Sequence, residues 1–411
     1  MTYAIVGGGI AGVTVAQELR ARAPEEEIVV FNAEPHPLYS RMLLKEFAKG
    51  AAPEDSIRIH DEAWFEARAI DYRGGTRVTD VEDGTVVLDS GDTMAYDTLF
   101  ATAGGSQVDP FGITRRADNA FGMWSLEETR RIKDLAESGE MGTAVVIGAG
   151  FLGLELADAL ALQGVETHFV MRGYWSRHGM GREGAEIVHR ALADNGIAVD
   201  DEQSVESFEM DGDRVVAVET TEQTIPCDFV GVAVGLAPNV EYLDGTAAAV
   251  DGGVVVDEHL RSADPSIYAA GDVARYYDRV LDRYDQTGTW LSAIDQGRVA
   301  AAHALGDEDA VFSTVEGHSV AIDELDAPVV FLGDWDGGDE AMDRLYDETR
   351  YRRIAFEHDR PVGASLIGDS GDVVGQLKQI IRDGPECSDA EKRALLDPYL
   401  DRRQFLSAPT A

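Results

Sequence analysis

Three glycines near the start of the chain have the spacing of a turn that binds a dinucleotide. Gly7, Gly9 and Gly12 follow an apolar run over residues 3–6, which predicts a buried strand, and precede residues 13–22, which predict a helix with one apolar face. With this spacing, the first glycine permits a tight turn, the second lets the backbone approach a pyrophosphate, and the third lets helix and strand pack closely. The free N–H groups at the helix N-terminus then bind the phosphates.

A carboxylate follows at the distance that such a site requires. A second strand is predicted over residues 27–31, and Glu34 lies just past it, about 20 residues after Gly12, where an acid usually binds a ribose hydroxyl. The glycine spacing alone is weak evidence, because a glycine-rich turn can exist without a ligand. The strand, glycines, helix, second strand and acid in this order predict a dinucleotide site.

The segment after Glu34 carries two basic side chains that could contact a cofactor. Pro35 and Pro37 predict an extended loop, which leads into a short helix before residue 45. In a flavoprotein this loop would pass the pyrophosphate and the flavin ring, so Arg41 and Lys45 are candidates for phosphate and ring contacts. The alternative is that both are solvated surface charges.

The chain then repeats the same order of elements. A hairpin predicted over residues 76–88 and a strand over residues 98–102 complete the first half, which ends in Ala103-Gly104-Gly105. The second half contains, in order, a buried strand at 143–147, the glycines Gly148, Gly150 and Gly153, a helix to residue 162, a strand at 167–170, a meander at 215–226, and a buried strand at 229–234 followed by Gly235. Two such signals in one order predict two dinucleotide sites.

The second site differs from the first at the position of the acid. Met171 stands where a ribose-binding carboxylate is expected, Arg172 follows it, and Arg177 and Arg182 come soon after. Arginine at this place can pair with a 2′-phosphate, so the pattern predicts a preference for NADPH. The alternative is that these are ordinary surface arginines, since arginine makes up most of the basic residues.

Composition restricts the possible partners. The chain has 411 residues, enough for two or three domains, and its 76 acidic and 35 basic residues give a net charge of −41, which argues against nucleic acid and anionic membranes. The acids are spread along the chain, as in proteins of salt-loving organisms; an acidic face for a basic partner is the alternative. No apolar run approaches the ~18 residues that span a bilayer, and the first residues lack the basic segment of a signal peptide, so we expect a cytoplasmic protein.

The two cysteines give no sign of redox or metal chemistry. Cys227 and Cys387 lie far apart in sequence and form no metal-type spacing. A redox-active cysteine pair close in sequence is therefore impossible, and each thiol is expected to be a small buried hydrophobe. We expect no metal site and no thiol in turnover.

These motifs, in this order, resemble the two-dinucleotide-binding-domain flavoproteins of the pyridine nucleotide–disulfide oxidoreductase superfamily over nearly the whole chain. Residues 96–104 resemble the segment that returns the chain to the flavin domain, with Ala103 where the family usually has glycine. Residues 267–272 resemble the second flavin motif, which implies that Asp272 binds the ribityl chain. Residues 39–44 and the predicted helix from Trp290 look most like rubredoxin and ferredoxin reductases and the flavin part of assimilatory nitrite reductase.

The resemblance implies a charge pair near the flavin. In those relatives a lysine near the flavin pairs with a glutamate in the helix after the second glycine motif. Glu155 fits this position just after Gly153, whereas Lys45 is displaced by one residue from the family pattern. The alternative is that Glu155 only stabilises the helix N-terminus, where a carboxylate is favourable in any case.

The implied fold is α/β, with two Rossmann-like dinucleotide-binding domains and a C-terminal α+β domain. We expect a FAD domain at residues 1–118 and 244–310, an NAD(P)H domain at residues 119–243, and the C-terminal domain at residues 311–411. Lys45 and Glu155 are the predicted catalytic residues. The predicted cofactor-binding residues are Gly7, Gly9, Ile10, Ala11, Gly12, Ala33, Glu34, Arg41, Lys45, Val81, Thr102, Ala103, Gly104, Gly148, Gly150, Gly153, Arg172, Arg177, Gly235, Gly271, Asp272 and Trp290.

The resemblance further implies that hydride passes from NAD(P)H to FAD and that electrons continue to a small acidic redox protein of the rubredoxin or ferredoxin type. The chain lacks the cysteines that disulfide reductases carry in the first helix region, so the acceptor must lie outside it. Two alternatives stay open. One is an oxidase or quinone reductase, and the other is a flavin-bound signalling or structural protein resembling apoptosis-inducing factor. The oligomeric state stays open as well.

Overall fold

The strand before the first glycine motif lies in the middle of a five-stranded sheet. In the computed structural model, which describes residues 1–278, 283–313, 318–320, 325 and 328–405, the strand order is β19-β7-β1-β2-β3, and all neighbours are parallel. The strands are β1 (Thr2–Val6), β2 (Glu27–Asn32), β3 (Asp71–Gly74), β7 (Thr98–Ala101) and β19 (Ile267–Ala269). The inner strands are apolar on both faces, as a sheet covered on both sides requires.

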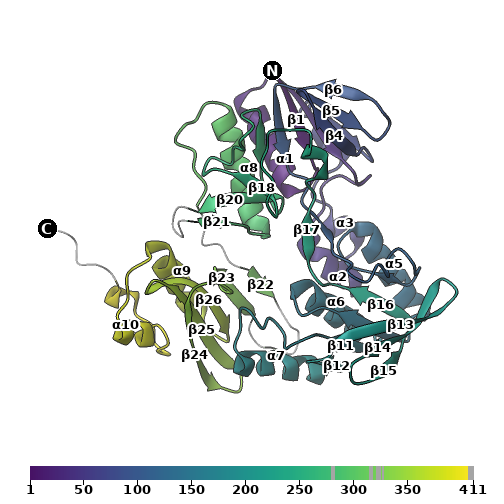
Figure 1. The fold of residues 1–411 in the computed structure, drawn as a ribbon, viewed down its shortest axis with the longest axis vertical. Coiled ribbons are helices and arrows are strands. Elements are labelled where there is room, and N and C mark those ends of the chain that lie inside the picture. Colours follow the sequence, from purple (N-terminus) through teal and green to yellow (C-terminus); the bar gives the residue numbers. More distant parts are fainter. Residues whose placement is uncertain (279–282, 314–317, 321–324, 326–327, 406–411) are drawn as a thin grey trace. The chain divides into compact units, whose positions relative to one another are not determined.

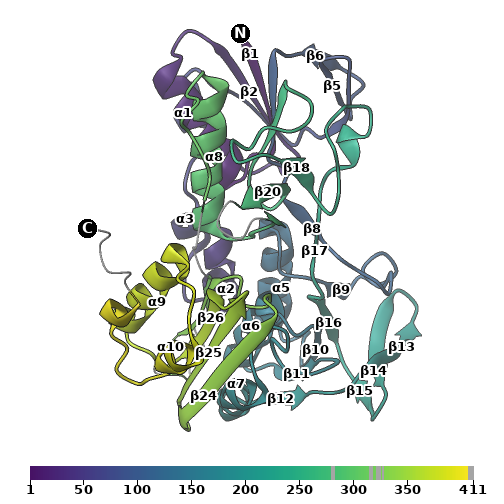
Figure 2. The same cartoon turned by 60° about the vertical axis from the view of Figure 1, so that its left-hand side comes forward.

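Two helices far apart in sequence lie side by side against this sheet. They are α1 (Ile10–Arg22) and α8 (Trp290–Ala304), as both views show (Figures 1 and 2). Two small three-stranded sheets complete this unit, formed by β4 (Val78–Glu82), β5 (Thr85–Leu88) and β6 (Thr93–Ala95), and by β18 (Val254–Val256), β20 (Ala274–Asp278) and β21 (Arg283–Asp285). The short helices are η1 (Arg41–Leu43), α3 (Glu54–Ile57), α4 (Glu62–Glu66) and η2 (Glu241–Leu243).

A second parallel sheet repeats the first. Its order is β12-β11-β10-β16-β9, with the strand before the second glycine motif again in the middle. The elements are β9 (Ala120–Phe121), α5 (Leu126–Ser138), β10 (Thr143–Ile147), α6 (Phe151–Leu162), β11 (Glu166–Val170), α7 (Arg182–Asp194), β12 (Ile197–Asp200) and β16 (Phe229–Val232). An antiparallel sheet follows β12, made of β13 (Val205–Asp211), β14 (Arg214–Thr220) and β15 (Thr224–Pro226). The short strands β8 (Gly105–Gln107) and β17 (Leu236–Pro238) pair with each other.

The last part of the chain is an antiparallel sheet with closing helices. The sheet order is β22-β23-β26-β25-β24, from β22 (His318–Val320), β23 (Val329–Gly333), β24 (Glu340–Asp347), β25 (Arg350–Glu357) and β26 (Arg360–Ile367). The closing helices are α9 (Gly371–Asp383), α10 (Asp389–Ala394) and η3 (Arg402–Gln404). Arg352 on β25 is fully buried; it pairs with Asp369 at 2.8 Å and donates to the Leu395 carbonyl at 2.7 Å, which ties the closing segment to the sheet.

By compactness the chain divides into two units. The first comprises residues 1–42, 53–106 and 236–314, and the second residues 43–52, 107–235 and 315–411. The short helix α2 (Leu44–Ala48) therefore belongs to the second unit, where it packs against α5 and α6, although sequence order places it between two segments of the first unit. The C-terminal sheet also packs within the second unit. The functional domain boundaries given above stay a prediction.

The elements flanking both glycine motifs lie close to their predicted places. The strand predicted at 143–147 coincides with β10, and the helix predicted from residue 13 begins three residues earlier, at Ile10. The helices α5 and α7 were not among the predicted elements. No helix in the described part of the chain is long and apolar enough to cross a membrane.

Candidate cofactor and coenzyme sites

The first glycine of each motif makes room for a neighbouring strand. Gly7 has a φ of +118°, and a Cβ there would lie 2.2 Å from the carbonyl oxygen of Thr102, at the end of β7. Gly148 has a φ of +142°, and a Cβ there would lie 2.1 Å from the carbonyl oxygen of Ala233, just past β16. Only glycine fits both the conformation and the space at these two positions.

The second glycine of each motif faces open space. Gly9 and Gly150 are the N-cap residues of α1 and α6, and a Cβ at either position would have no described atom within 4 Å. Neither helix carries an acidic residue in its first turn. Free backbone N–H groups, a positive helix end and no blocking side chain fit a pyrophosphate at both places.

The third glycines bring helix and turn together. A Cβ on Gly12 would lie 2.0 Å from the Gly7 carbonyl oxygen, and one on Gly153 would lie 3.1 Å from the Gly148 carbonyl oxygen. The two motifs thus use their glycines in the same way, in two different units.

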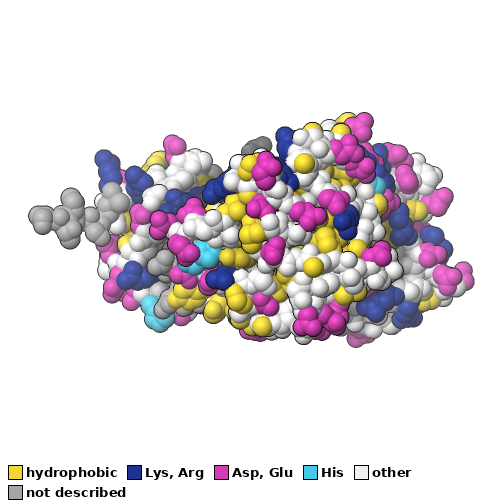
Figure 3. Space-filling model, turned by 90° about the horizontal axis from the view of Figure 1, so that it is seen from above, with side chains coloured by type: hydrophobic (Ala, Val, Ile, Leu, Met, Phe, Trp, Pro, Cys, Tyr) yellow, Lys and Arg dark blue, Asp and Glu magenta, His cyan; other side chains and the backbone are white. Residues whose placement is uncertain are grey.

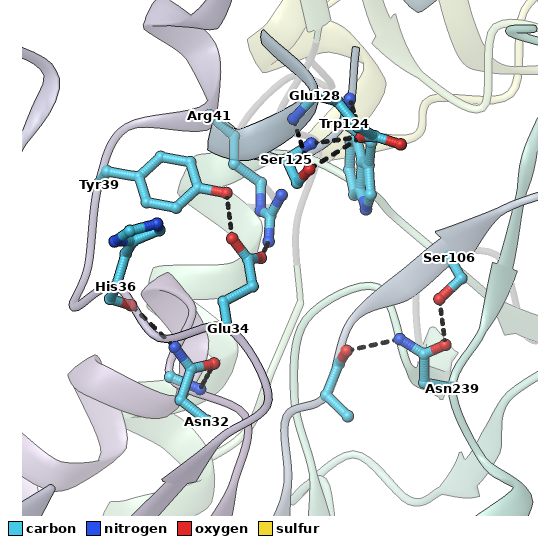
Figure 4. A network of polar contacts seen from close by, with 12 residues as sticks. Asn32, Glu34, His36, Tyr39, Arg41, Ser106, Trp124, Ser125, Glu128 and Asn239 are labelled. Atoms are coloured by element: carbon cyan, nitrogen blue, oxygen red, sulfur yellow. Dashed lines mark hydrogen bonds and ion pairs between the residues drawn. The ribbon is translucent and has the colours of Figure 1, made fainter. Parts of the chain in front are cut away.

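Glu34 and Arg41, both predicted to contact the cofactor, contact each other. The Glu34 carboxylate accepts a hydrogen bond from the Tyr39 hydroxyl at 2.7 Å and pairs with the Arg41 guanidinium (Figure 4). Burial raises the pKa of the Asp272 carboxyl, and the positive charge of Arg41 opposes that rise. Arg41 therefore acts on both acids, which are predicted to hold the ribose and the ribityl chain.

Asn32, which the sequence analysis did not single out, fixes the glycine turn to the following loop. Its Oδ1 accepts from the Gly8 N–H at 3.2 Å, and its Nδ2 donates to the His36 carbonyl at 2.9 Å (Figure 4). The Tyr72 hydroxyl donates to the same carbonyl at 2.8 Å. The position of Asn32 at the end of β2 could have identified it from the sequence, because the end of this strand lies beside the glycine turn that follows the parallel strand β1.

The segment that ends β7 is held by its own hydrogen bonds. The Thr102 hydroxyl donates to the Val6 and Gly7 carbonyls at 3.1 and 3.0 Å. Asn239 Nδ2 donates to the Ala103 carbonyl at 2.9 Å, and the backbone N–H of Asn239 donates to the Gly104 carbonyl at 2.9 Å. Thr102 thus positions the turn, and Asn239 adds a contact that the sequence did not reveal.

A buried amide lies beside the second flavin motif. Gly271, whose φ is +82°, donates its N–H to Gln296 Oε1 at 2.6 Å, and Gln296 on α8 is fully buried. The Nε2 of Gln296 has no hydrogen-bond partner among the described residues. A buried donor of this kind is costly unless something accepts its hydrogen bond, so it fits a polar group bound at this motif.

The other predicted residues of the first site have different surroundings. In the first turn of α1, Ile10 is half-buried and Ala11 is buried. If Gly271 had a Cβ, that atom would lie 3.2 Å from the Cβ of Ala11. Ala33 is exposed, whereas the Val81 side chain on β4 is fully buried in the core. Trp290 begins α8 and packs partly buried against the same core.

Lys45 makes a buried ion pair within the second unit. Its ammonium pairs with Asp158 on α6, whose side chain is fully buried. Asp158 also accepts from Asn195 Nδ2 at 2.5 Å. The resemblance led us to expect Glu155 as the partner; the structure adds Asp158, one helical turn further along the same face.

The charges of Lys45 and Asp158 act on the carboxyl group of Glu155. Burial raises the pKa of its carboxyl to about 7; the charge of Lys45 opposes this rise, and the carboxylates of Asp158 and Glu46 add to it. A carboxyl group with this pKa can hold or release a proton near neutral pH.

The loop after β11 exposes the two predicted arginines. Met171 is buried, whereas Arg172 and Arg177 are exposed, and neither forms an ion pair with an acid in the described parts of the chain. The nearby acids are engaged elsewhere, since Arg182 pairs with Asp201 at 3.2 Å and Glu202 at 3.1 Å. Gly235, at the end of the neighbouring strand segment, has a φ of +130°.

Comparison with known proteins shows which family this chain belongs to. Residues 1–297 match the family model described as pyridine nucleotide-disulphide oxidoreductase. The chain belongs to this family.

Three relatives show how far the likeness extends. The chain is 29% identical over 413 residues to nitrite reductase [NAD(P)H] of Bacillus subtilis, matching 96% of this chain and 49% of that protein, so it spans about half the length of this relative. It is 29% identical over 414 residues to the ferredoxin–NAD(+) reductase component of the anthranilate 1,2-dioxygenase system of Burkholderia cepacia, matching 98% and 99% of the two chains. The crystal structure of the covalent putidaredoxin reductase–putidaredoxin complex superposes with a TM-score of 0.87 and 25% identity, over 98% of this chain and 97% of that one.

The family and these reductases support FAD and a pyridine nucleotide as the two cofactors. The open glycine turns, the buried Gln296 amide, and the acids at Glu34 and Asp272 fit them. Glu34, Asp272 and Arg41 would bind FAD hydroxyl and phosphate groups.

The family is named for a disulphide that this chain does not form. Cys227 and Cys387 are both buried and free, and burial raises the pKa of their thiols to about 12 and about 11. The expectation that they are buried is confirmed. Within the described residues, no cluster of His, Cys, Asp or Glu could hold a metal ion.

Gly9→Val is expected to yield a folded but colourless protein. Gly9 has an extended conformation, with φ −73° and ψ −175°, and open space at Cβ, so valine fits the fold but occupies the place of the pyrophosphate. The measurement is the flavin absorbance of the purified variant beside its thermal unfolding midpoint. Gly150→Val is the matched control, which should keep its flavin and lose pyridine-nucleotide binding. A yellow Gly9→Val protein with full flavin content would contradict the placement.

Glu155→Gln is expected to change how stability depends on pH. The folded-state pKa of about 7 lies above the ordinary value of 4.5 for this carboxyl, so the unfolded state alone releases the proton as pH rises from 4.5 to 7. The folded state therefore loses stability relative to the unfolded state across this window. The glutamine variant lacks this loss. Urea-unfolding free energies of native and variant proteins should diverge across this window, with the exposed Glu140→Gln as control. A difference that stays constant with pH would refute the shifted pKa.

Proposed function

We propose that this chain oxidises NAD(P)H at the second glycine motif and passes electrons through FAD at the first motif to a small acidic redox protein of the ferredoxin or rubredoxin type. The observation that carries the proposal is the repetition of one open glycine turn in both units, combined with two cysteines that are both buried. The named activities of the ferredoxin and putidaredoxin reductases support the same conclusion.

The chain contributes binding, orientation and charge. Bound FAD supplies the chemistry, by taking a hydride from the nicotinamide and releasing electrons to an acceptor. Gly9 and Gly150 leave room for the two pyrophosphates at helix N-termini, where backbone N–H groups bind them. Glu34 keeps acceptor capacity beyond its contacts with Tyr39 and Arg41, because a carboxylate can accept about four hydrogen bonds.

Lys45 and Glu155 are the proposed catalytic residues. Asp158 pairs with the Lys45 ammonium and fixes it in the second unit, since a buried charge needs a partner of opposite sign. Glu155 can hold a proton at neutral pH beside that pair. Together they would set the charge near the site of hydride transfer.

The acceptor lies outside the chain in this proposal. Both thiols are buried and stay protonated, so a relay through cysteine is not part of it. An oxidase or quinone reductase is the second candidate, and a slowly turning-over, flavin-bound signalling protein is the third.

Stopped-flow reduction separates these three candidates. For the reductase, NADPH should bleach the flavin rapidly, oxygen uptake should be slow, and added ferredoxin or rubredoxin should be reduced under anaerobic conditions. Fast oxygen uptake without acceptor would instead support the oxidase. Slow reduction with a persistent charge-transfer band would support the signalling protein.

We further propose that NADPH is the preferred coenzyme. Arg172 and Arg177 lie on the loop where the 2′-phosphate would bind, and neither forms an ion pair with an acid among the described residues. A charge-assisted hydrogen bond contributes about 1.5–3 kcal/mol. Salt screens exposed charges, so we expect only about tenfold discrimination, which corresponds to ~1.4 kcal/mol.

Replacing both arginines tests this preference. The ratio of kcat/KM for NADPH to that for NADH should exceed one in the native protein and fall about tenfold in Arg172→Ala with Arg177→Ala, since about 1.4 kcal/mol is lost. Arg214→Ala, an exposed arginine on β14 of the same unit, controls for the general loss of positive charge. Native preference for NADH, or a ratio that the double variant leaves unchanged, would overturn the assignment.

A further inference from the structure

The loop that carries the two arginines rests on the second glycine turn. This coenzyme loop, residues 171–181, follows β11 and leads into α7. The Ser176 N–H donates to the Ala149 carbonyl at 3.0 Å, and the Trp175 indole N–H donates to the Gly150 carbonyl at 3.4 Å. Any shift of the loop therefore changes where the arginines stand relative to the glycine turn.

The other side of the loop is held by the C-terminal sheet. The Gly181 N–H donates to the Tyr351 hydroxyl at 2.9 Å, and this hydroxyl donates in turn to Asp343 at 2.8 Å. The Ser365 hydroxyl donates to the Gly179 carbonyl. Tyr351 and Ser365, on β25 and β26, are fully buried, whereas Asp343 is exposed. The Ser365–Gly179 bond is therefore shielded from water, and the bonds of the Tyr351 hydroxyl are partly shielded.

Three glycines in the loop and the start of α7 make room for side chains of the C-terminal part. A Cβ on Gly179 would lie 2.4 Å from the Trp335 ring, and one on Gly181 would lie 2.5 Å from the Tyr351 hydroxyl. At Gly184 the distance to the Tyr351 ring would be 2.7 Å. The close fit means that the C-terminal sheet shapes this loop as well as covering it; α7 and the sheet are neighbours in both ribbon views (Figures 1 and 2).

An aromatic cluster extends the contact to the glycine helix. Phe331 on β23 packs edge-to-face on Phe151, the first residue of α6, with ring centroids 5.0 Å apart. It also packs on Trp175 at 5.9 Å, and both Phe331 and Trp175 are fully buried. The C-terminal sheet thus contacts the coenzyme loop and the beginning of the helix that would bind the coenzyme phosphates.

We propose that the C-terminal sheet positions the coenzyme loop, through Tyr351 and Ser365, and so sets the affinity of the second site for the adenosine part of the coenzyme. The inference rests on the proposed function of that site. In this role, Tyr351 and Ser365 are positioning residues that act through the backbone of Gly181 and Gly179 without touching the coenzyme.

The test removes single hydroxyls and measures binding without turnover. Calorimetry with 2′,5′-ADP and with ADP reports on the adenosine part alone, in holoprotein that carries its flavin. Tyr351→Phe and Ser365→Ala should each weaken the preferred fragment about 3- to 10-fold, as expected for one buried hydrogen bond. KM for the coenzyme should rise by a similar factor while kcat stays unchanged.

Tyr346→Phe is the matched control. Tyr346 lies in the same sheet, and its hydroxyl donates to the Leu396 carbonyl at 2.6 Å, on the closing segment of the C-terminal part. A merely structural effect would lower the unfolding midpoint in all three variants and leave fragment affinity unchanged. Loss of affinity in Tyr351→Phe and Ser365→Ala, with native affinity in Tyr346→Phe, supports the positioning role. If Tyr351→Phe fails to fold, Ser365→Ala decides the question alone.

The outcomes separate this inference from the proposed function. Unchanged affinity for both fragments in Tyr351→Phe and Ser365→Ala would overturn the positioning role, whatever the coenzyme. If kcat/KM shows that the native protein prefers NADH, the assignment of NADPH fails, and the positioning role is then judged on the affinity for ADP.

Discussion

The structure depends on one steric constraint, the close passage of a backbone carbonyl past the first glycine of each motif. The Thr102 and Ala233 carbonyl oxygens occupy the places where the Cβ atoms of Gly7 and Gly148 would be. This passage lets the turn lie against the next strand and directs the following helix N-terminus to the carboxyl edge of the sheet. There the second glycine leaves the phosphate position open. Because each unit satisfies this constraint separately, the chain has two glycine turns of one design, to which the proposed function assigns FAD and the pyridine nucleotide.

The parts that could be predicted are those whose causes lie close together in sequence. The strand–glycine–helix order around Gly7 and Gly148 depends on local periodicity and on single glycines, and the strands and helices flanking both motifs were found in their predicted places. Helix α7 was missed because it begins after Gly181 without a side-chain cap, and so lacks the usual start signal. Gln296 and Tyr351 could not be found, because their importance comes from partners distant in sequence; Asn32 was overlooked, although its place at the end of β2, beside the glycine turn, is a signal that the sequence offers.

The pair of Lys45 and Asp158 shows how a resemblance can point to the right helix and miss a residue on it. Glu155 and Asp158 lie on the same face of α6, about one turn apart. Lys45, which is displaced by one residue from the family pattern, pairs with Asp158. Breaking a buried pair of this kind leaves an uncompensated charge and typically costs about 3–5 kcal/mol. Helix α2 packs against α5 and α6 of the second unit, although sequence order places it between two segments of the first, and the Lys45–Asp158 pair is one of its contacts there.

The chain contains many acidic side chains that could pair with the two loop arginines, Arg172 and Arg177. With 76 acidic against 35 basic residues, an exposed arginine normally has acids within reach, and acidic side chains are spread across the face drawn in Figure 3. Beside the coenzyme loop, Asp201 and Glu202 are paired with Arg182. These two pairs reduce the repulsion that those two acids would exert on a phosphate. The C-terminal sheet also holds the loop backbone. In the proposed site, Arg172 and Arg177 are then available to a ligand, and the last part of the chain would belong to the coenzyme site without contacting the coenzyme.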